Sequence, residues 1–466
     1  MITQKWWVLA AVACGTFMAT LDSSIVNIAL PSMTKALSAD LSSVKWVVVL
    51  YLTAITCTLL PFGRLSDLYG RRRVFVAGFA TFIVGSGLCG LSGQIGWLLF
   101  SRFIQGLGAS MLMSNGPAII TSSFPSGERG KALGTLAMVV SIGLLSGPAV
   151  GGFLITHFGW PSIFLVNIPV GLMGLLLVKK FVAADIRVES RHPFDWVGTL
   201  LQSFFLLSVM FLVEPPAISF HPTSPVHDHA TFPISRLLMF LLTIMLGAIF
   251  VKVESMSKAP LFDFSLLKIR RFWTANLAAY FVFVAFSSIG LLMPFFLEEV
   301  FHFTTDRAGL FMTAVPAVVF VIAPISGRLS DHVGSRELGI LGTLMGSLGL
   351  FSLAGIFGNG ISQHSSAISI LIPLAMIGGA TGFFQSPNNN LIMGVVPPNK
   401  LGIASALLAT IRNLGLATGV SISTLIFTWR HYVTGDFQQA LRFTFAVAGC
   451  FALLATVATI AQGRRP

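Results

Sequence analysis

The chain has 466 residues, of which 55% are hydrophobic and only 10% charged, and its mean hydropathy is +0.85. A soluble domain carries about 25% charged residues, so this composition excludes an ordinary water-soluble protein. The net charge of +12 would suggest nucleic acid as a partner of a soluble protein, but here the basic residues fall between apolar runs, which indicates orientation in a bilayer.

A helix that spans a bilayer needs about 20 apolar residues, and the chain alternates such runs with short polar breaks. We therefore predict an all-α membrane protein. The run after Lys5 is too long for a signal peptide and no cleavage site follows it, so we expect an uncleaved first span. Taken in order, the predicted spans number fourteen: residues 6–30, 44–63, 74–93, 95–121, 132–156, 160–178, 195–213, 234–251, 272–297, 308–327, 338–358, 366–394, 402–428 and 442–461.

Lysine and arginine are distributed unevenly over the breaks between these spans. If the chain starts in the cytoplasm, 21 of the 29 lie on that side and six on the other, while Arg102 and Arg412 fall inside spans. This bias follows the positive-inside rule. The sequence thus predicts that both termini are cytoplasmic, because one helix more or fewer would reverse every later loop.

The first span contains a carboxylate, Asp22, in the segment LDSSIVNIALP. It lies about 24 Å beyond Trp6 at 1.5 Å per residue, well inside the bilayer. Charged groups at this depth are costly and are functional candidates by default, so Asp22 is a candidate proton carrier. The alternative is a structural aspartate held by Ser23, Ser24 or Asn27.

A charged loop, GRLSDLYGRRR from Gly63 to Arg73, follows the second span and recurs as GRLSDHVGSR from Gly327 to Arg336. The repeat predicts two related six-helix halves, residues 1–185 and 269–466, with spans 7 and 8 inserted at 186–268. Asp67 can accept hydrogen bonds from Arg71 and so tie helices on the cytoplasmic face. We expect a gate made by Gly63, Asp67, Gly70, Arg71 and Asp331; the alternative is a basic anchor.

The fourth and fifth spans carry two further patterns. Arg102, in RFIQGLGAS, stays protonated and needs a carboxylate or carbonyl partners, and Gly106 and Gly108 would let a neighbouring helix approach. The alternative is an arginine with a structural role only. In GLLSGPAVGG, three glycines spaced by four line one helix face beside a proline that we expect to bend the helix, which suits a moving interface or ordinary packing: Gly143, Gly147, Gly151 and Pro148.

Other polar groups are fewer. The long outer segment from Glu214 to Pro233 holds three histidines, but its prolines favour a solvated loop over a metal site. The four cysteines lie in apolar runs, so we expect packing residues, no metal and no cofactor: Cys14, Cys57, Cys89 and Cys450. Glu298 and Glu299 end the ninth span, facing either a cavity or the outer loop, and Arg412 in span 13 is interpreted as structural.

The twelfth span concentrates uncharged polar side chains around Pro387, and such groups at a proline break can bind substrate or coupling ions. With Asn27 and Gln105 from the first half, they make our candidate substrate-binding set: Asn27, Gln105, Gln385, Asn388 and Asn389. The candidate proton-coupling residues are Asp22, Arg102 and Glu298.

Together, four motifs resemble the major facilitator superfamily, and within it the fourteen-span drug:proton antiporter branch. They are the Gly63 loop, RFIQGLGAS, GLLSGPAVGG and LDSSIVNIALP, and the resemblance covers nearly the whole chain. It implies two pseudo-symmetric six-helix bundles, alternating access, proton-driven export without a cofactor, and a monomer in the bacterial cytoplasmic (inner) membrane. By position, Arg102 matches the helix 4 arginine implicated in proton coupling, and Asp67 and Arg71 match the inner gate.

Three departures from the family pattern stand out. Glu298 occupies a place where many relatives carry glutamine, which implies an extra protonatable group. His332 and Ser335 replace residues that are commonly basic, which implies a weaker second gate. Span 13 lacks the acids that some exporters of dicationic drugs use, which puts divalent cations in doubt as substrates.

The sequence therefore favours a proton-coupled exporter of lipophilic drugs or toxic compounds, cationic ones included, with a Phe- and Met-rich interior suited to loose apolar recognition. The alternative is a proton-coupled or uncoupled transporter of one specific metabolite or lipid. A membrane enzyme or receptor is a third class, but no catalytic or P-loop motif accompanies the spans. The expected partners are a small-molecule substrate, protons and the lipid bilayer, with no nucleic acid.

Overall fold

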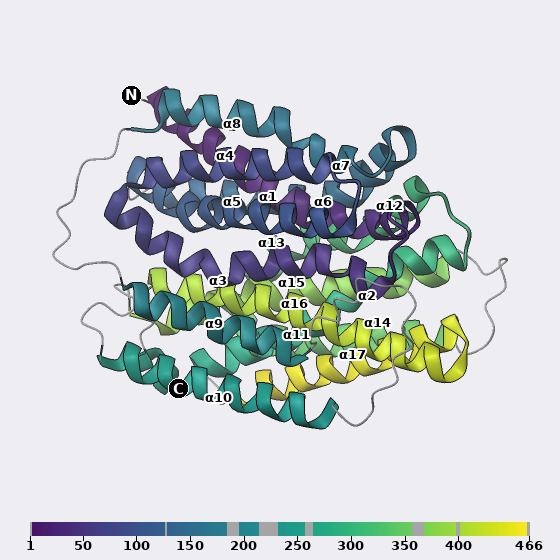
Figure 1. Ribbon diagram of the computed structural model, residues 1–466. Helices are drawn as coiled ribbons and strands as arrows, with labels where there is room; N and C mark the ends of the chain where they lie inside the picture. The colour runs from purple at the N-terminus through teal and green to yellow at the C-terminus, as the bar shows by residue number, and fades with distance from the viewer. Residues whose placement is uncertain are drawn as a thin grey trace.

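The computed structural model of the chain describes residues 2–125, 128–183, 195–213, 232–256, 264–356, 368–397 and 401–463. Within these ranges all regular structure is helical, and the helices run side by side through one thick layer (Figure 1). In chain order they are α1 (Ile2–Ala36), α2 (Leu41–Val44), α3 (Trp46–Tyr69), α4 (Arg71–Gly90), α5 (Ile95–Ser123), α6 (Arg129–Phe158), α7 (Ser162–Leu165), α8 (Asn167–Phe181), α9 (Trp196–Val213), α10 (Phe232–Met256), the 3-10 helix η2 (Phe264–Lys268), α11 (Arg270–Glu299), α12 (Thr305–Met312), α13 (Ala314–Val333), α14 (Ser335–Ile356), α15 (Ile368–Val395), α16 (Leu401–Thr434) and α17 (Phe437–Ile460).

Thirteen helical segments in the described residues are long and apolar enough to cross a membrane. Three of them combine two consecutive helices: α2 with α3, α7 with α8, and α12 with α13. Each of the fourteen apolar runs predicted from the sequence contains helix, but the seventh, α9, has an apolar stretch of only 17 residues, Trp196–Leu212. An all-helical, multi-pass membrane protein is thus confirmed.

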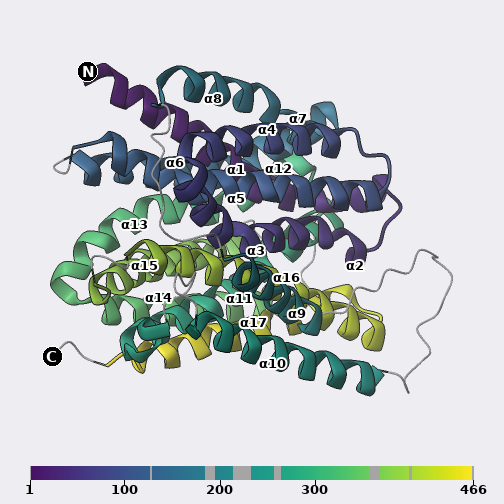
Figure 2. The ribbon, with the colours of Figure 1, turned by 60° about the vertical axis from the view of Figure 1, so that its left-hand side comes forward.

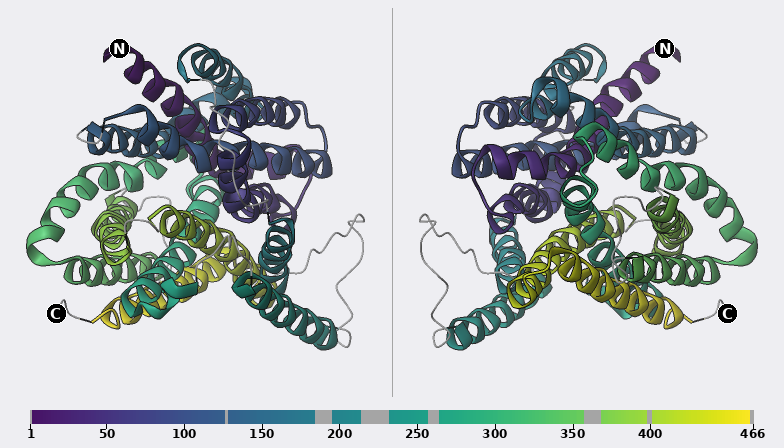
Figure 3. Two further views of the ribbon diagram at one scale, coloured as in Figure 1. Left: turned by 90° about the vertical axis from the view of Figure 1, so that its left-hand side faces the viewer. Right: turned by 90° about the vertical axis from the view of Figure 1, so that its right-hand side faces the viewer.

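The helices assemble as two groups, α1 to α8 and α11 to α17, which Figure 3 shows end-on above and below a midline. Within each group the helices pack on one another. Between the groups, α3 contacts α16, α6 contacts α12 and α13, and α1 contacts α11. Helix α1 begins and α17 ends at the same end of the layer (Figures 1 and 2).

Helices α9 and α10 lie at the edge of this arrangement (Figures 2 and 3). They pack against each other, and α9 also touches α3 and α16, one helix from each group. Helix α10 is the least buried of the thirteen candidate spans, and its surface is lined by exposed apolar side chains that suit contact with lipid.

The two copies of the charged loop form the same structure. The Ser66 hydroxyl donates to the Gly63 carbonyl at 2.7 Å, and the Ser330 hydroxyl donates to the Gly327 carbonyl at the same distance. Each copy ends its helix at a glycine with positive φ, 107° at Gly70 and 105° at the second-copy glycine, where a side chain would be strained. The repeat predicted from the sequence is therefore a repeat of backbone geometry.

The arginine two residues after each of these glycines has the same contact in both groups. Arg72 donates to the Lys179 carbonyl in the last turns of α8, and Arg336 donates to the Ile460 carbonyl at the end of α17. Both arginines thus satisfy a carbonyl at the C-terminus of the last helix of their own group, where helix carbonyls lack intrahelical partners. This contact closes each group on itself.

Candidate functional site

The aspartate in the first span is enclosed by side chains from two other helices. One carboxylate oxygen of Asp22 accepts from Arg102 Nη1 at 2.6 Å. The other accepts from Gln105 Nε2 at 2.8 Å and from Asn167 Nδ2 at 3.1 Å. Asp22 is 0% exposed and Arg102 1% exposed, so the ion pair is removed from water. The alternative in which Ser23, Ser24 or Asn27 holds the carboxylate is wrong.

The guanidinium of Arg102 makes further contacts besides the one with Asp22. Its Nε donates to the Val47 carbonyl at 2.9 Å, and Nη1, besides binding Asp22, donates to the Gln105 side-chain oxygen at 2.6 Å. Its central carbon lies 4.1 Å from the centre of the Tyr51 ring and 5.5 Å from that of Phe164. Cation–π contact and carbonyl bonds together stabilise a charge that would otherwise be costly to bury.

The glutamine completes the cluster by bridging to α4. Gln105 Nε2 donates to the Ser86 hydroxyl at 2.7 Å, and the Cys89 thiol lies 3.7 Å from its side-chain oxygen. Cys89, one of the four cysteines predicted to be packing residues, therefore also touches this polar cluster. We call Asp22, Ser86, Arg102, Gln105 and Asn167 the polar network; it joins α1, α4, α5 and α8.

Glycines allow the helices to come this close. A Cβ atom at Gly106 would meet the backbone of Tyr51 in α3 at 2.9 Å, and one at Gly108 would overlap the backbone of α4 at Phe82. A Cβ at Gly85 would in turn meet the backbone of Gln105 at 2.7 Å. The prediction that Gly106 and Gly108 admit neighbouring helices is confirmed, and this close packing sets the short distances in the network.

The second group of helices has the same packing without the polar network. Gly147 of α6 faces Ser24 of α1, and Gly419 of α16 faces Ser287 of α11 in the same way. Likewise Gly78 of α4 faces the Gly108 carbonyl, and the glycine 264 positions later, in α14, faces the Ala380 carbonyl of α15. These contacts, together with those of Arg72 and Arg336 with the last helix of each group, assign each residue of the first group a counterpart in the second.

With the two groups aligned in this way, every member of the polar network has an apolar counterpart. Asp22, Ser86, Arg102, Gln105 and Asn167 correspond to Ala285, Leu350, Leu374, Ile377 and Ala448. All five counterparts are buried and belong to the main hydrophobic core. The second group therefore shows that the fold needs no charge at these places, so the ion pair of the first group is not a requirement of packing.

The predicted substrate-binding residues do not gather at one place. Gln105 belongs to the buried polar network. Asn27 lies between the two groups, where its amide nitrogen would be 3.3 Å from a Cβ on Gly290 of α11. Asn388 is buried and donates to the Ala275 carbonyl at 3.3 Å, inside the second group.

Helix α15 continues without a break through Pro387. The expected proline break, which led us to propose substrate contacts there, is therefore wrong, because the helix accommodates the proline within its length. Gln385 and Asn389 are half-buried on this helix.

Glu298 and Glu299 are the last two residues of α11, which ends two residues beyond the predicted span. Glu298 is half-buried beside Thr305 of α12, and one of its carboxylate oxygens is buried without a hydrogen-bond partner. Glu299 is exposed and forms an ion pair with Lys35 of α1 at 3.1 Å, which joins the two groups.

The residues predicted to form a gate lie at the opposite end. Arg71 donates to Asp67 at 3.1 and 3.3 Å, as expected, and also to the Ala118 carbonyl of α5 at 3.2 Å. These bonds join α3, α4 and α5, all in the first group. The backbone at Asp331 continues α13, but its side chain lies outside the described part of the structure.

The glycine row of α6 faces α1 in the same group: Gly143, Gly147 and Gly151 have no room for a Cβ beside Thr20, Ser24 and Ile25. Its neighbour Pro148 faces the other group, because the Pro148 carbonyl occupies the place that a Cβ on Gly309 of α12 would take. Gly152 likewise meets the backbone of α12 at Thr305. The pattern thus combines packing within a group with contact between groups.

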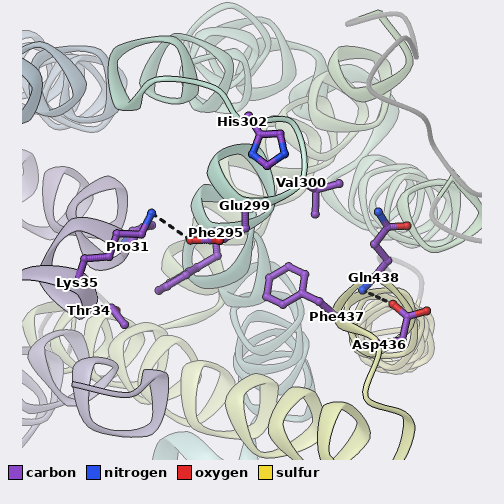
Figure 4. A pocket seen from close by; sticks show the side chains of 10 residues that line it. All are labelled: Pro31, Thr34, Lys35, Phe295, Glu299, Val300, His302, Asp436, Phe437 and Gln438. Carbon is purple, nitrogen blue, oxygen red and sulfur yellow. Dashed lines mark hydrogen bonds and ion pairs between the residues drawn. The ribbon is translucent and has the colours of Figure 1, made fainter. Parts of the chain in front are cut away.

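A cavity of about 720 Å³ opens at the end of the layer that carries the Lys35–Glu299 pair (Figure 4). Helix α1 lines one side, and the end of α11 and the α16–α17 turn line the other. Its lining consists of Pro31, Thr34, Lys35, Phe295, Glu299, Val300, His302, Asp436, Phe437 and Gln438. This lining includes neither a member of the polar network nor any predicted substrate-binding residue.

Sequence reasoning missed the part played by Asn167, Ser86 and Tyr51. Asn167 is an isolated amide in a predicted span, which is a weak but usable signal because a buried amide needs a partner. The three histidines of the segment 214–233 lie outside the described residues, and so does the segment 184–194. Within the described residues, no group of three or more His, Cys, Asp or Glu side chains could hold a metal ion.

Comparison with known proteins agrees with this architecture. The profile of the Major Facilitator Superfamily matches residues 12–420 and 276–463. Among curated proteins, a riboflavin transporter of Clostridioides difficile is 36% identical over 425 residues, covering 91% of this chain and 88% of that protein. A multidrug resistance protein of Mycobacterium tuberculosis is 31% identical over 428 residues, covering 90% and 76%. A tetracenomycin C resistance and export protein of Streptomyces glaucescens is 29% identical, covering 92% and 77%.

Solved structures share the fold. A D-xylose-proton symporter aligns with a TM-score of 0.68 at 16% identity, covering 98% of this chain and 97% of that one. An inward-open structure of the xylose transporter of Escherichia coli aligns with a TM-score of 0.65 at 14% identity, covering 98% and 95%. With a family profile that spans most of its length, the chain belongs to the Major Facilitator Superfamily and is a membrane transporter, not an enzyme.

Proposed function

We propose that the protein is a proton-coupled exporter of lipophilic compounds that works by alternating access in a bacterial inner membrane. In this proposal fourteen helices span the bilayer, in two six-helix bundles with α9 and α10 inserted, and both termini lie in the cytoplasm. The relatives named for multidrug resistance and for tetracenomycin C export support export of this kind.

The observation that carries the proton-coupling part is the polar network, present in one group and replaced by alanine, leucine and isoleucine in the other. A buried ion pair is weak evidence for stability, since an apolar replacement is often as stable. Its presence where the fold does not need it favours a functional role. Asp22 would take up and release the proton, and Arg102, as a fixed positive charge, would set how readily it does so.

Reconstitution into proteoliposomes with an imposed pH gradient tests the proposal. The wild-type protein is expected to move a lipophilic dye against the proton flow, and Asp22→Asn, which keeps the size of the side chain but cannot take up a proton, to abolish the gradient-driven part. Unchanged pH-driven transport by Asp22→Asn would remove Asp22 as the carrier. If dye movement by the wild type does not depend on the pH gradient, the protein is a uniporter and not an antiporter.

A second candidate is a transporter of one specific metabolite. The riboflavin transporter that shares 36% identity over 91% of the chain supports it. A panel of flavins and unrelated dyes discriminates the two: saturable transport of a single metabolite with no dye transport would favour the second candidate.

A further inference from the structure

The second arginine inside a span, Arg412, differs from Arg102 in having no partner among the residues that the structure describes. It is the twelfth residue of α16, about 16 Å along the helix from Leu401 at 1.5 Å per residue. Arg102 is fully enclosed by a carboxylate, a carbonyl and two aromatic rings. Arg412 makes no hydrogen bond, ion pair or ring contact with any residue of the described part of the chain, and it is half-buried.

Helix α16, which carries this side chain, lies at the contact between the two groups. It packs against α11 of its own group and against α3 of the other, as Figure 2 shows for the neighbouring ribbons. Next to Arg412 on the helix, Thr410 and Asn413 are buried, and Gly415 packs on the Tyr280 backbone. A guanidinium at this depth faces the protein interior or a water-filled space, because exposure to lipid is costly. The partial exposure of Arg412 is therefore exposure to the interior between the groups.

The interior offers this cation no fixed counter-charge. In the described part of the chain, every Asp and Glu other than Asp22 lies within three residues of a helix end or just outside a helix. Asp22 is already bound by Arg102, Gln105 and Asn167. The pair Asp22–Arg102 is neutral overall, so Arg412 leaves one net positive charge at mid-depth.

We propose that Arg412 is a substrate-recognition residue and that the transporter takes organic compounds bearing an anionic or carbonyl-rich group, such as a carboxylate, a phenolate or an imide, in preference to organic cations. A planar guanidinium can donate two parallel hydrogen bonds to such a group, and its field in a low-dielectric interior repels cations. This deepens the proposed function, on which it rests, and it reverses our expectation that the compounds are cationic and that Arg412 is structural.

Binding of two xanthene dyes of similar shape and opposite charge tests the proposal. Fluorescein is the anionic probe and a rhodamine is the cationic one, each titrated by fluorescence polarisation against the purified protein in lipid nanodiscs. The wild type should bind fluorescein more tightly. Arg412→Gln should weaken fluorescein binding about tenfold or more, since hydrogen bonds to charged groups are among the stronger ones. Arg412→Glu should reverse the preference.

Two variants make the result interpretable. Arg412→Lys keeps the charge but loses the forked geometry, so it should retain the preference with weaker fluorescein binding, and it provides the test if Arg412→Gln does not fold. Arg442→Gln removes an exposed charge of α17 and should bind both dyes as the wild type does. An unchanged dye preference in Arg412→Gln or Arg412→Glu, or a wild type that prefers the rhodamine, would overturn the inference.

The same dyes in proteoliposomes separate this inference from the proposed function. Fluorescein binding that depends on Arg412, without pH-driven transport of either dye, would leave the inference standing and defeat proton-coupled export. Gradient-driven transport that is unchanged when Arg412 is substituted would support proton-coupled export and overturn this inference.

Discussion

At the scale of single residues, the molecule treats its two membrane arginines in opposite ways. Arg102 is enclosed and neutralised, and Arg412 is left with an open face. A buried pair of opposite charges is close to neutral for stability when both members are present, whereas one member alone is an uncompensated charge. The polar network is therefore sensitive to the loss of either partner but tolerant of losing both.

This asymmetry gives a stability prediction. Arg102→Leu alone should lower the free energy of unfolding by about 3–5 kcal/mol, because it leaves the Asp22 carboxylate buried and unpaired. The double variant Asp22→Ala with Arg102→Leu should recover most of that loss, since it copies the residues at the equivalent places of the second group, Ala285 and Leu374. Thermal midpoints of the detergent-solubilised variants measure both.

Lys35→Leu is the matched control, because the Lys35–Glu299 pair is exposed and such pairs contribute about 0–1 kcal/mol. A double variant no more stable than Arg102→Leu alone would mean that Asp22 is held in place for packing after all. Transport by the recovered double variant, if coupled to protons, would contradict the role proposed for the network.

At the scale of elements, the charged loops at Gly70 and Gly334 each connect helices of one group in this structure, and their role as a gate stays a prediction. In each, a serine, a glycine and an arginine repeat the same bonds, and the arginine binds the last helix of its own group. The first copy adds the Arg71 bonds to Asp67 and to α5, and the second copy carries a serine, Ser335, at the place of Arg71.

We therefore expect the shared arginines to matter equally and the additional one to matter only in the first group. Arg72→Ala and Arg336→Ala should each lower stability by about 0.5–1.5 kcal/mol, the usual contribution of a hydrogen bond. Arg71→Ala should cost at least as much, and Ser335→Ala should be close to neutral. Thermal unfolding of the four variants checks this order, and a much larger effect of Arg72→Ala than of Arg336→Ala would contradict the equivalence.

At the scale of the whole molecule, the two groups meet closely at the end that carries Lys35 and Glu299. There Gly152 and Gly309 bring α6 against α12, and Asn27 meets Gly290. Alternating access requires these contacts to separate during the cycle. A rigid link across them should stop transport without unfolding either group.

A disulfide between α6 and α12 tests this requirement. Gly152→Cys with Thr305→Cys, in a background without the four native cysteines, should form a disulfide under oxidation because the two backbones are in contact. Transport should fall to background and return on reduction. Each single cysteine variant is the control, and a crosslinked protein that still transports would show that the two helices need not part.

The halves, the repeat and most of the polar network's members could be predicted from the sequence, because charges and glycines inside apolar runs are conspicuous. The hydrogen-bond partners within the polar network could not be predicted from the sequence. Whether Asp22 meets Ser23, Asn27 or Arg102 depends on which face of α1 packs on α5, and an apolar helix whose residues are buried on several sides carries no periodic signal for this. Asn167 was missed for the same reason, and Pro387 was overinterpreted because a packed helix can carry a proline.

The contact of Asn27 with Gly290 has a further consequence. The register that pairs Ser24 with Ser287 also pairs these two, so each is the other's counterpart, and they touch on the pseudo-twofold axis. At such a place a residue and its copy compete for one volume. A symmetric dimer of single bundles would have to put two amides there or none. One chain that contains both bundles can place a single amide on the axis. Exact symmetry excludes a single amide there, so the joining of the two bundles in one chain is what permits it.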